Sequence, residues 1–245
     1  MNLKNNVSTV DKTDQKNFDK IGDQWWDLDG PMKPLHDFNN IRIKFIKKVL
    51  EKHNFNSYKP FEKLNILDIG CGGGILTEPM ARLGGNVTGL DSNQNAIKIA
   101  KKHAKKSSLR ISYFSDNIQK FKPKNQYDVI TCMEVVEHVS NLENFIYEAK
   151  KYLKPNGFFI GSTINKSVSS FLLAIVTAEY IFNLLPKNTH QWQKFVTPKK
   201  LSEIFLRNNL LEFKFKGVIY NPFLRQWNFT NFDKVNYLFS VRKLK

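Results

Sequence analysis

The sequence contains only two cysteines among its 245 residues, Cys71 and Cys132, and each stands in its own apolar run. Two isolated cysteines offer no paired spacing, which argues against a disulfide framework and against a cysteine-based zinc site. Such sparing use of cysteine is typical of a reducing compartment. We therefore expect a cytoplasmic protein.

Long apolar runs and leader signals are lacking as well. The nearest candidate for a membrane span, residues 171–185, is short and contains Glu179 and Asn183, whereas a span needs roughly 18–20 uncharged residues. The opening residues, MNLKNNVSTVDKTDQK, are polar, which argues against a secretory signal. Several aspartates precede the first arginine, which argues against a mitochondrial presequence.

Arginine is scarce even though the chain is strongly basic. The formal net charge is +16, yet only six of the 38 basic residues are arginines. Nucleic-acid surfaces favour the forked guanidinium group for phosphates and base edges. Lysine excess beside abundant Asn, Ile and Phe also arises from an AT-rich genome. We therefore expect no nucleic-acid partner, although the charge permits an anionic surface as partner.

Strand-like and helix-like segments alternate from residue 64 onward. We expect strands at 64–68, 86–91, 110–114, 127–133 and 158–163, helices at 75–83, 95–106 and 142–153, and turns at 155–157 and 221–223. Alternation with short connections predicts a doubly wound, mostly parallel α/β sheet. A helix from residue 197 and strands at 211–219 and 235–241 add an antiparallel edge, which makes seven strands.

We expect a single domain over residues 18–245, preceded by a disordered tail at 1–17. Its parts are an N-terminal helical lid or flank at 18–60 with the pair Trp25-Trp26, a core at 64–163, an inserted helical cap at 166–197, and a C-terminal helix and strands at 198–245.

The stretch NILDIGCGGGIL, residues 65–76, runs an apolar strand into glycines at 70, 72 and 74. A strand-to-helix turn without Cβ atoms lets a ligand press against the backbone at a helix N-terminus. The dinucleotide fingerprint fails because its sixth position is Ile75, and the phosphate-binding P-loop fails because no lysine follows. The turn therefore needs a different ligand.

The pattern Asp-Ile-Gly-Cys-Gly-Gly-Gly resembles motif I of class I S-adenosylmethionine-dependent methyltransferases, which have a Rossmann-like sheet. Their ligand is a sulfonium with an amino-acid tail, so Gly70 and Gly72 would allow close approach and Asp68 would face its cationic end. Asp91 ends the next strand, where a carboxylate can bond both ribose hydroxyls. Asp116 follows the third strand, where polar side chains reach an adenine.

Several further blocks are similar to one family, the ubiquinone-biosynthesis O-methyltransferases. They are WWDLDGPMKPLH (25–36), LDIGCGGGILTEPMARLGGNVTGLD (67–91), YDVITCMEVVEHV (127–139), AEYIFNLLPKNTHQWQKF (178–195) and DKVNYLFS (233–240). The similarity runs from about residue 18 to residue 241. It implies methyl transfer from S-adenosylmethionine to ring hydroxyls of polyprenylated phenols or catechols, namely 3-demethylubiquinol and 2-polyprenyl-6-hydroxyphenol.

The resemblance places the family's cofactor contacts on Arg42, Gly70, Asp91 and Met133. Arg42 is the only arginine of the N-terminal flank, and its fork can hold the methionyl carboxylate. Met133 ends the fourth strand, where a thioether can pack against adenine or the sulfonium, or simply fill the core. The alternative functions are methylation of RNA, methylation of another small phenol, and a scaffold that only binds the cofactor.

The stretch EVVEH offers three interpretations. Glu134, Glu137 and His138 have the spacing i, i+3, i+4 of one face of a helix start. They could hold a divalent cation such as Mg²⁺, as described for members of the family, which would orient vicinal ring oxygens. His138 could instead act as a general base assisted by Glu137. The third interpretation is a purely structural pair at a helix terminus.

The insertion at 166–197 has more apolar residues than an exposed loop should show. Because the implied substrate carries an isoprenoid tail, we expect this segment either to cap the site and dock on anionic lipid or to pack against protein. The partners we expect are the polyprenylated phenol or quinol, an anionic membrane surface and other ubiquinone-pathway enzymes. The setting would be the cytoplasm, at the inner face of a bacterial membrane.

Overall fold

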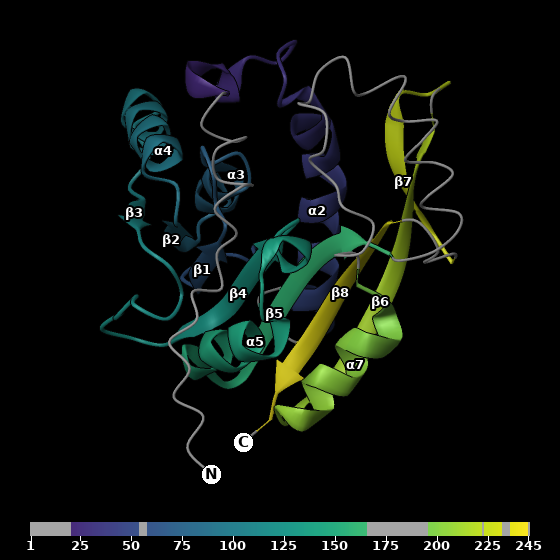
Figure 1. Ribbon diagram of the computed structural model, residues 1–245. Helices are drawn as coiled ribbons and strands as arrows, with labels where there is room; N and C mark the ends of the chain where they lie inside the picture. Colours follow the sequence, from purple (N-terminus) through teal and green to yellow (C-terminus); the bar gives the residue numbers. More distant parts are fainter. Residues whose placement is uncertain (1–20, 54–57, 166–195, 222, 232–235, 245) are drawn as a thin grey trace.

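The computed structural model describes residues 21–53, 58–165, 196–221, 223–231 and 236–244. Their centre is an eight-stranded sheet in the order β3-β2-β1-β4-β5-β8-β6-β7 (Figure 1). The first five strands in this order are parallel, and the last three pair antiparallel. The strands are β1 (Asn65–Ile69), β2 (Asn86–Asp91), β3 (Ser112–Ser115), β4 (Tyr127–Met133), β5 (Leu153–Ile164), β6 (Leu210–Asn221), β7 (Gln226–Thr230) and β8 (Asn236–Lys243). The expected doubly wound α/β fold is confirmed.

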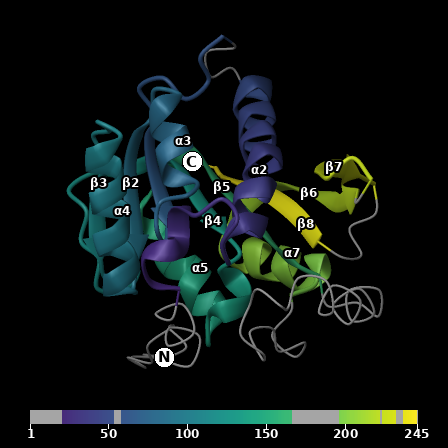
Figure 2. The same cartoon turned by 90° about the horizontal axis from the view of Figure 1, so that it is seen from above.

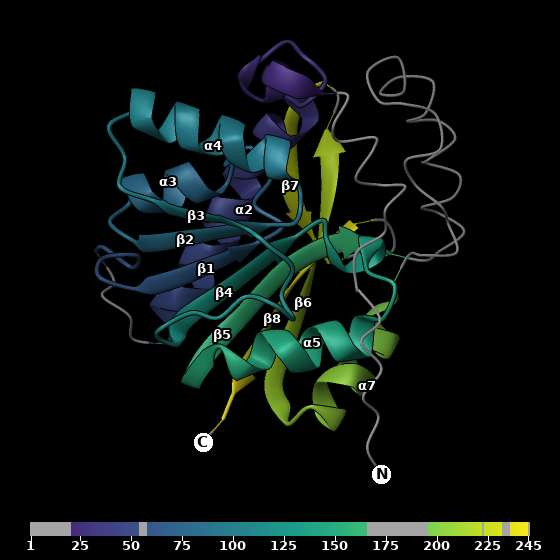
Figure 3. The ribbon, with the colours of Figure 1, turned by 60° about the vertical axis from the view of Figure 1, so that its left-hand side comes forward.

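Helices cover both faces of this sheet. The helical segments are η1 (Gly22–Trp26), α2 (Lys33–Lys52), α3 (Thr77–Arg82), α4 (Gln94–Lys106), η2 (Val136–His138), α5 (Leu142–Lys151) and α7 (Pro198–Arg207). Figure 3 shows α2, α3 and α4 on one face and α5 and α7 on the other. One buried cluster includes Phe145, Phe205 and Phe239, and a second includes Phe45 and Ile46 of α2. The two faces of the sheet therefore carry separate apolar cores.

The strand order reverses direction between β1 and β4. From β1 the chain moves outward to β2 and β3, and it then returns to place β4 on the other side of β1. In open α/β sheets, ligands bind beyond the carboxyl ends of the strands at such a reversal. The glycine turn follows β1 and the EVVEH stretch follows β4, so the topology brings both segments to this point.

The sheet has one strand more than the sequence predicts. The added strand, β7, forms a hairpin with β6, and Tyr220 pairs with Trp227 in its register. The predicted turn is confirmed, because the Asn221 side-chain oxygen accepts hydrogen bonds from the backbone N–H groups of Phe223 and Leu224, each at 3.0 Å. The strand is only five residues long and lies at the edge of the described sheet. Its alternation of apolar and polar residues is therefore too short to stand out in the sequence.

Two local expectations need correction. The segment at 155–157 is not a turn before β5 but an irregularity within it, where Asn156 has φ 63° and the register against β4 shifts. The EVVEH stretch does not begin a helix. Glu134 lies in the left-handed region at φ 55°, and only a three-residue 3-10 turn, η2, follows. The helical spacing of Glu134, Glu137 and His138 therefore does not apply.

The N-terminal flank folds across one end of the sheet. Its long helix, α2, lies between α3 and the β6–β7 hairpin when the sheet is viewed from above (Figure 2). Aromatic contacts join α2 to β7, with ring centroids of Phe38 and Trp227 4.6 Å apart and those of Phe45 and Phe229 6.4 Å apart. The tail expected at 1–17 and most of the insertion expected at 166–197 lie outside the described residues.

In the part of the chain that the structure describes, none of the helices has both the length and the apolar character required to cross a bilayer.

One buried carboxylate connects three of these elements. Asp68 of β1 accepts hydrogen bonds from the hydroxyls of Thr77 in α3, at 2.6 Å, and Thr131 in β4, at 2.7 Å. Its side chain is 2% exposed, and this burial raises the pKa of the carboxyl to about 6, although the two hydroxyls and Arg42 oppose the shift. Asp68 therefore fixes where β1 ends relative to its neighbours.

We expect the substitution Asp68→Asn, which keeps the shape and abolishes the titration, to change how stability depends on pH. The folded carboxyl holds its proton to about pH 6, whereas the unfolded one loses it near pH 4. Relative to Asp68→Asn, the wild type should therefore lose roughly 2 kcal/mol of unfolding free energy between pH 4.5 and pH 7.5. Denaturant unfolding at both pH values measures this difference.

Asp128→Asn is the matched control. Asp128 lies on β4, is partly exposed and pairs with Lys154 at 2.8 Å, so its replacement should not reproduce the loss. An Asp68→Asn difference that is the same at both pH values would contradict the account of Asp68.

Candidate active site

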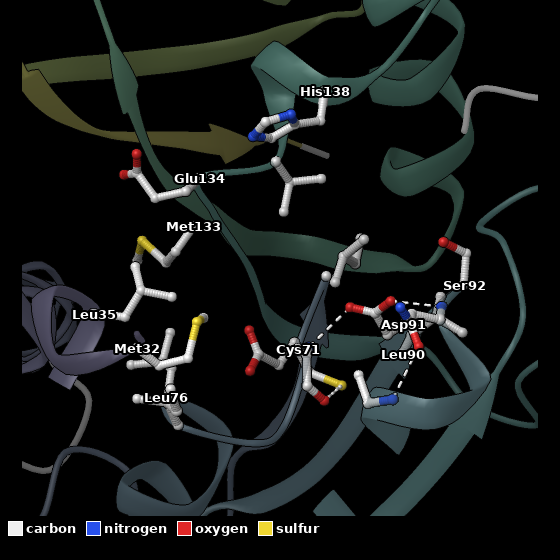
Figure 4. A pocket seen from close by; sticks show the side chains of 18 of the residues that line it. Met32, Leu35, Cys71, Leu76, Leu90, Asp91, Ser92, Met133, Glu134 and His138 are labelled. Atoms are coloured by element: carbon white, nitrogen blue, oxygen red, sulfur yellow. Dashed lines mark hydrogen bonds between the residues drawn. The ribbon is translucent and has the colours of Figure 1, made fainter. Parts of the chain in front are cut away.

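A cavity of about 370 Å³ lies at the carboxyl ends of β1, β2 and β4. Most of the residues singled out in the sequence line it, and they are Arg42, Asp68, Gly70, Gly72, Asp91, Asp116, Met133, Glu134 and His138. Glu137 is the exception and does not line the cavity. In Figure 4, Met133, Glu134 and His138 follow one another along one wall, and Asp91 lies on another.

The glycines allow the turn after β1 to adopt backbone angles that residues with a Cβ atom rarely adopt. Gly70 and Gly72 have φ 72° and 52°, in the left-handed region that favours glycine. A Cβ on Gly70 would overlap the side chain of Val135, and one on Gly72 would lie 2.5 Å from the ring of Trp25. Packing by the protein's own side chains therefore accounts for both glycines, and their contact with a ligand stays a prediction.

Asp91 ties the glycine turn to the end of β2. Its two carboxylate oxygens accept the backbone N–H groups of Gly72 and Asn93, each at 2.8 Å (Figure 4). A carboxylate has about four acceptor sites, so Asp91 can accept a further donor beside these backbone groups. Burial raises the pKa of this carboxyl, and the backbone hydrogen bonds oppose the shift. The backbone N–H of Asp116, at the end of β3, bonds the Asp91 carbonyl at 3.0 Å, so the two acidic residues stand side by side.

Arg42 brings a buried positive charge to the cavity wall. Its side chain is 3% exposed and its guanidinium lies over the ring of Phe38, 4.6 Å from the centroid. Nη2 is 3.9 Å from a carboxylate oxygen of Glu134, but neither Nη2 nor Nε has a hydrogen-bond partner among the described residues. Burial lowers the pKa of this group, and Glu134 and Asp68 oppose the shift. Because buried N–H groups without a hydrogen-bond partner are costly, Arg42 fits an anionic ligand group in the cavity.

The residues of EVVEH point in different directions. Glu134 accepts a hydrogen bond from the hydroxyl of Ser162, and Glu137 accepts one from that of Thr163 at 2.8 Å. Glu137 is 2% exposed, and its other oxygen, Oε1, has no hydrogen-bond partner within the described part of the chain. Burial and then Glu134 raise the pKa of Glu137 to about 7. Of the two expected catalytic residues, only His138 reaches the cavity.

A search of the described residues finds no group of three His, Cys, Asp or Glu side chains placed to hold a metal ion. The proposed ligands Glu134, Glu137 and His138 do not converge there, because Glu137 turns to Thr163 inside the sheet. The metal role of these residues stays a prediction.

The N-terminal flank is fastened to the glycine turn by contacts that sequence reasoning missed. The indole N–H of Trp26 donates to the Gly73 carbonyl at 2.9 Å, and its ring stacks on His103 of α4 with centroids 3.6 Å apart. The side-chain amide of Asn39 donates to the Ile75 carbonyl at 2.7 Å. Trp25-Trp26 stood out as an aromatic pair, but only the fold shows which surface it covers.

Other missed residues either line the far wall of the cavity or support residues near it. Ser162 and Thr163 do not line the cavity, but their hydroxyls donate hydrogen bonds to Glu134 and Glu137. Ser162 and Thr163 end the strand FFIGST, and their position at the carboxyl end of a central strand was a usable signal. Trp227 also lines the cavity, but it lies on β7, the strand that the sequence pattern did not predict. Ile164 and Asn236 complete this wall.

Comparisons with known proteins agree with this geometry. A family model described as a methyltransferase domain matches residues 39–211. The ubiquinone biosynthesis O-methyltransferase of Pelagibacter ubique is 45% identical over 95% of this chain and 98% of its own length. That of Bradyrhizobium diazoefficiens is 42% identical over 94% of this chain and 92% of its own length.

Solved structures show the same fold at low identity. The magnesium protoporphyrin IX methyltransferase of Synechocystis, with bound SAM, has a TM-score of 0.63 at 13% identity over 97% of this chain and 100% of its own. The N-methyltransferase NodS of Bradyrhizobium japonicum, in complex with S-adenosyl-L-homocysteine, has a TM-score of 0.62 at 19% identity over 98% and 100%. The family expected from the sequence motifs is confirmed: this chain belongs to the ubiquinone biosynthesis O-methyltransferases.

Proposed function

We propose that this chain methylates ring hydroxyls of polyprenylated phenols or catechols, with S-adenosylmethionine as the methyl donor. The expected acceptors are 3-demethylubiquinol and 2-polyprenyl-6-hydroxyphenol. One observation carries the proposal. The Arg42 guanidinium is buried on the wall of the cavity with Nε and Nη2 lacking a hydrogen-bond partner in the described chain, and Asp91 stands on another wall. An anion receptor and a sugar-binding carboxylate in one cavity suit a donor that carries an amino-acid tail and a ribose.

Each donor-binding residue has its own task. Arg42 holds the methionyl carboxylate through its free N–H groups. Asp91 accepts the ribose hydroxyls with the lone pairs that Gly72 and Asn93 leave available. Asp116, next to Asp91, faces the adenine, and Met133 packs beside it as a 7% exposed thioether. When bound, S-adenosylmethionine supplies a methyl group made electrophilic by the neighbouring sulfonium.

The acceptor hydroxyl must lose its proton as the methyl group arrives. His138 is the residue of the cavity best suited to take it, since it is the one imidazole among the described residues that line the cavity and can act as a general base. Glu137 lies behind the wall, with a buried carboxyl whose pKa is raised to about 7, and it interacts with His138 electrostatically rather than with the substrate. The apolar side chains of Leu35, Phe38 and Phe145 then exclude water from the ring.

Membrane association is part of the same proposal. A polyprenylated acceptor resides in a bilayer, so the enzyme must approach the membrane surface to reach it. The segment 166–197, which the sequence analysis expects either to dock on anionic lipid or to pack against protein, lies almost wholly outside the described residues. Co-sedimentation with anionic vesicles tests this role.

We expect Arg42→Met to weaken donor binding by at least about 100-fold, because it removes two charge-assisted hydrogen bonds of roughly 1.5–3 kcal/mol each and keeps an apolar stem against Phe38. Calorimetry with S-adenosylhomocysteine measures the affinity without turnover. Arg82→Met is the matched control, since Arg82 is half-exposed on α3 and away from the cavity. An Arg42→Met protein that binds as tightly as the control would refute the assignment of the carboxylate site.

His138→Gln should lower kcat by about 100-fold with little change in donor affinity, as expected for loss of a general base. The assay uses labelled S-adenosylmethionine with a short-chain catechol, with total RNA as the competing acceptor. EDTA should leave the wild-type rate unchanged. If EDTA abolishes the activity and Mg²⁺ restores it, the metal interpretation replaces the base. If His138→Gln lowers only the melting temperature, the residue is structural.

A further inference from the structure

The cavity extends beyond its donor-binding end to a wall formed by α2 and β7. Phe38 and Trp227 both line it, and their ring centroids are 4.6 Å apart. A phenol ring and a sulfonium donor bound near the end of β1 do not by themselves require a wall from β7, at the other end of the strand order. This wall therefore offers an apolar surface to another part of the substrate.

The aromatic surface continues outward from this wall along the β6–β7 hairpin. Tyr220 is directly opposite Trp227 in the hairpin register, with ring centroids 5.4 Å apart, so both side chains lie on the face toward α2. Trp227 is partly buried, and Tyr220 is 38% exposed. Phe38, Trp227 and Tyr220 thus form a continuous row of rings from the cavity to the surface.

The row ends at a hairpin tip with two large exposed apolar side chains. Phe223 is 95% exposed and Leu224 is 64% exposed. The tip has a defined turn, because Asn221 accepts hydrogen bonds from the backbone N–H groups of both residues. Neither side chain folds back onto the sheet, although burial would stabilise each by about 1.5–3 kcal/mol. Such exposure beside a binding cavity marks a surface that an apolar ligand covers.

We propose that the rings of Phe38, Trp227 and Tyr220, with the tip residues Phe223 and Leu224, form a tail track that binds the polyprenyl chain of the acceptor. This inference rests on the proposed function, which gives the acceptor such a chain. The ring hydroxyl lies at the cavity end, near His138, and the isoprene units pass over the contacting rings of Phe38 and Trp227 toward Tyr220. The tip is where the tail passes into the bilayer.

This placement makes the track a determinant of specificity. A tail bound along the rings lowers KM for polyprenylated phenols without any role in the chemical step. Preference for a tailed acceptor over a tailless one therefore reports the track, whereas turnover of the tailless acceptor reports the active site.

The test compares kcat/KM for a polyprenylated catechol in detergent micelles with kcat/KM for the tailless catechol. Tyr220→Ala should lower the ratio of these values by about fivefold, as expected for loss of one partly buried ring from the tail contact. Phe223→Ser should lower it as well, and this variant cannot disturb the core because its side chain is almost fully exposed.

Ile219→Ala is the matched control. Ile219 precedes Tyr220, is 51% exposed and points to the opposite face of the hairpin, so its replacement should leave the ratio unchanged. The track is disproved if Tyr220→Ala and Phe223→Ser keep the wild-type ratio, or if Ile219→Ala lowers it equally.

A change of oligomeric state in the Tyr220→Ala variant, with the wild-type ratio of kcat/KM values kept, also disproves the track. The hairpin would then contact a second copy of the chain. A wild type that methylates neither catechol overturns the proposed function itself, and the track with it.

Discussion

The arrangement of the active site depends on a carboxylate, that of Asp68, which is buried at the base of the cavity. Asp68 receives hydroxyl hydrogen bonds from Thr77 and Thr131, so one side chain sets the end of β1 against both α3 and β4. The glycine turn begins two residues later, and Met133 and Glu134 follow Thr131 by two and three residues. The glycine turn and the wall that carries Met133 and Glu134 are therefore positioned by the same side chain. Asp68, which the sequence analysis expects to face the ligand, also holds β1, α3 and β4 together.

Much of this arrangement could be predicted from the sequence, because the relevant signals are local. The alternation of apolar runs predicts the parallel sheet. The expected strand ends at Asp68 and Asp91 predict the position of the cavity. The position of Arg42 depended on the family motifs, since a lone arginine on a helix pattern is more often solvent-exposed. In the structure it is buried on the cavity wall.

What could not be predicted depends on long-range contacts or on unusual backbone angles. EVVEH has the spacing of a helix, but Glu134 takes a left-handed conformation because its amide continues to bond the Ser162 carbonyl, at 3.0 Å, beside β5. The strand containing Trp227 is short and is defined only by its pairing with β6. Local propensity contains no information about either contact.

The fastening of the flank has a thermodynamic consequence. The same helix, α2, carries Arg42, proposed for the donor, and Phe38, proposed for the acceptor tail, and the flank preceding it rests on the glycine turn through Trp25 and Trp26. If both proposals hold, an event that lifts the flank would dismantle both binding sites together. Occupancy of one site would then favour occupancy of the other by the same factor in each direction, a reciprocal cooperativity that needs no relay through the sheet.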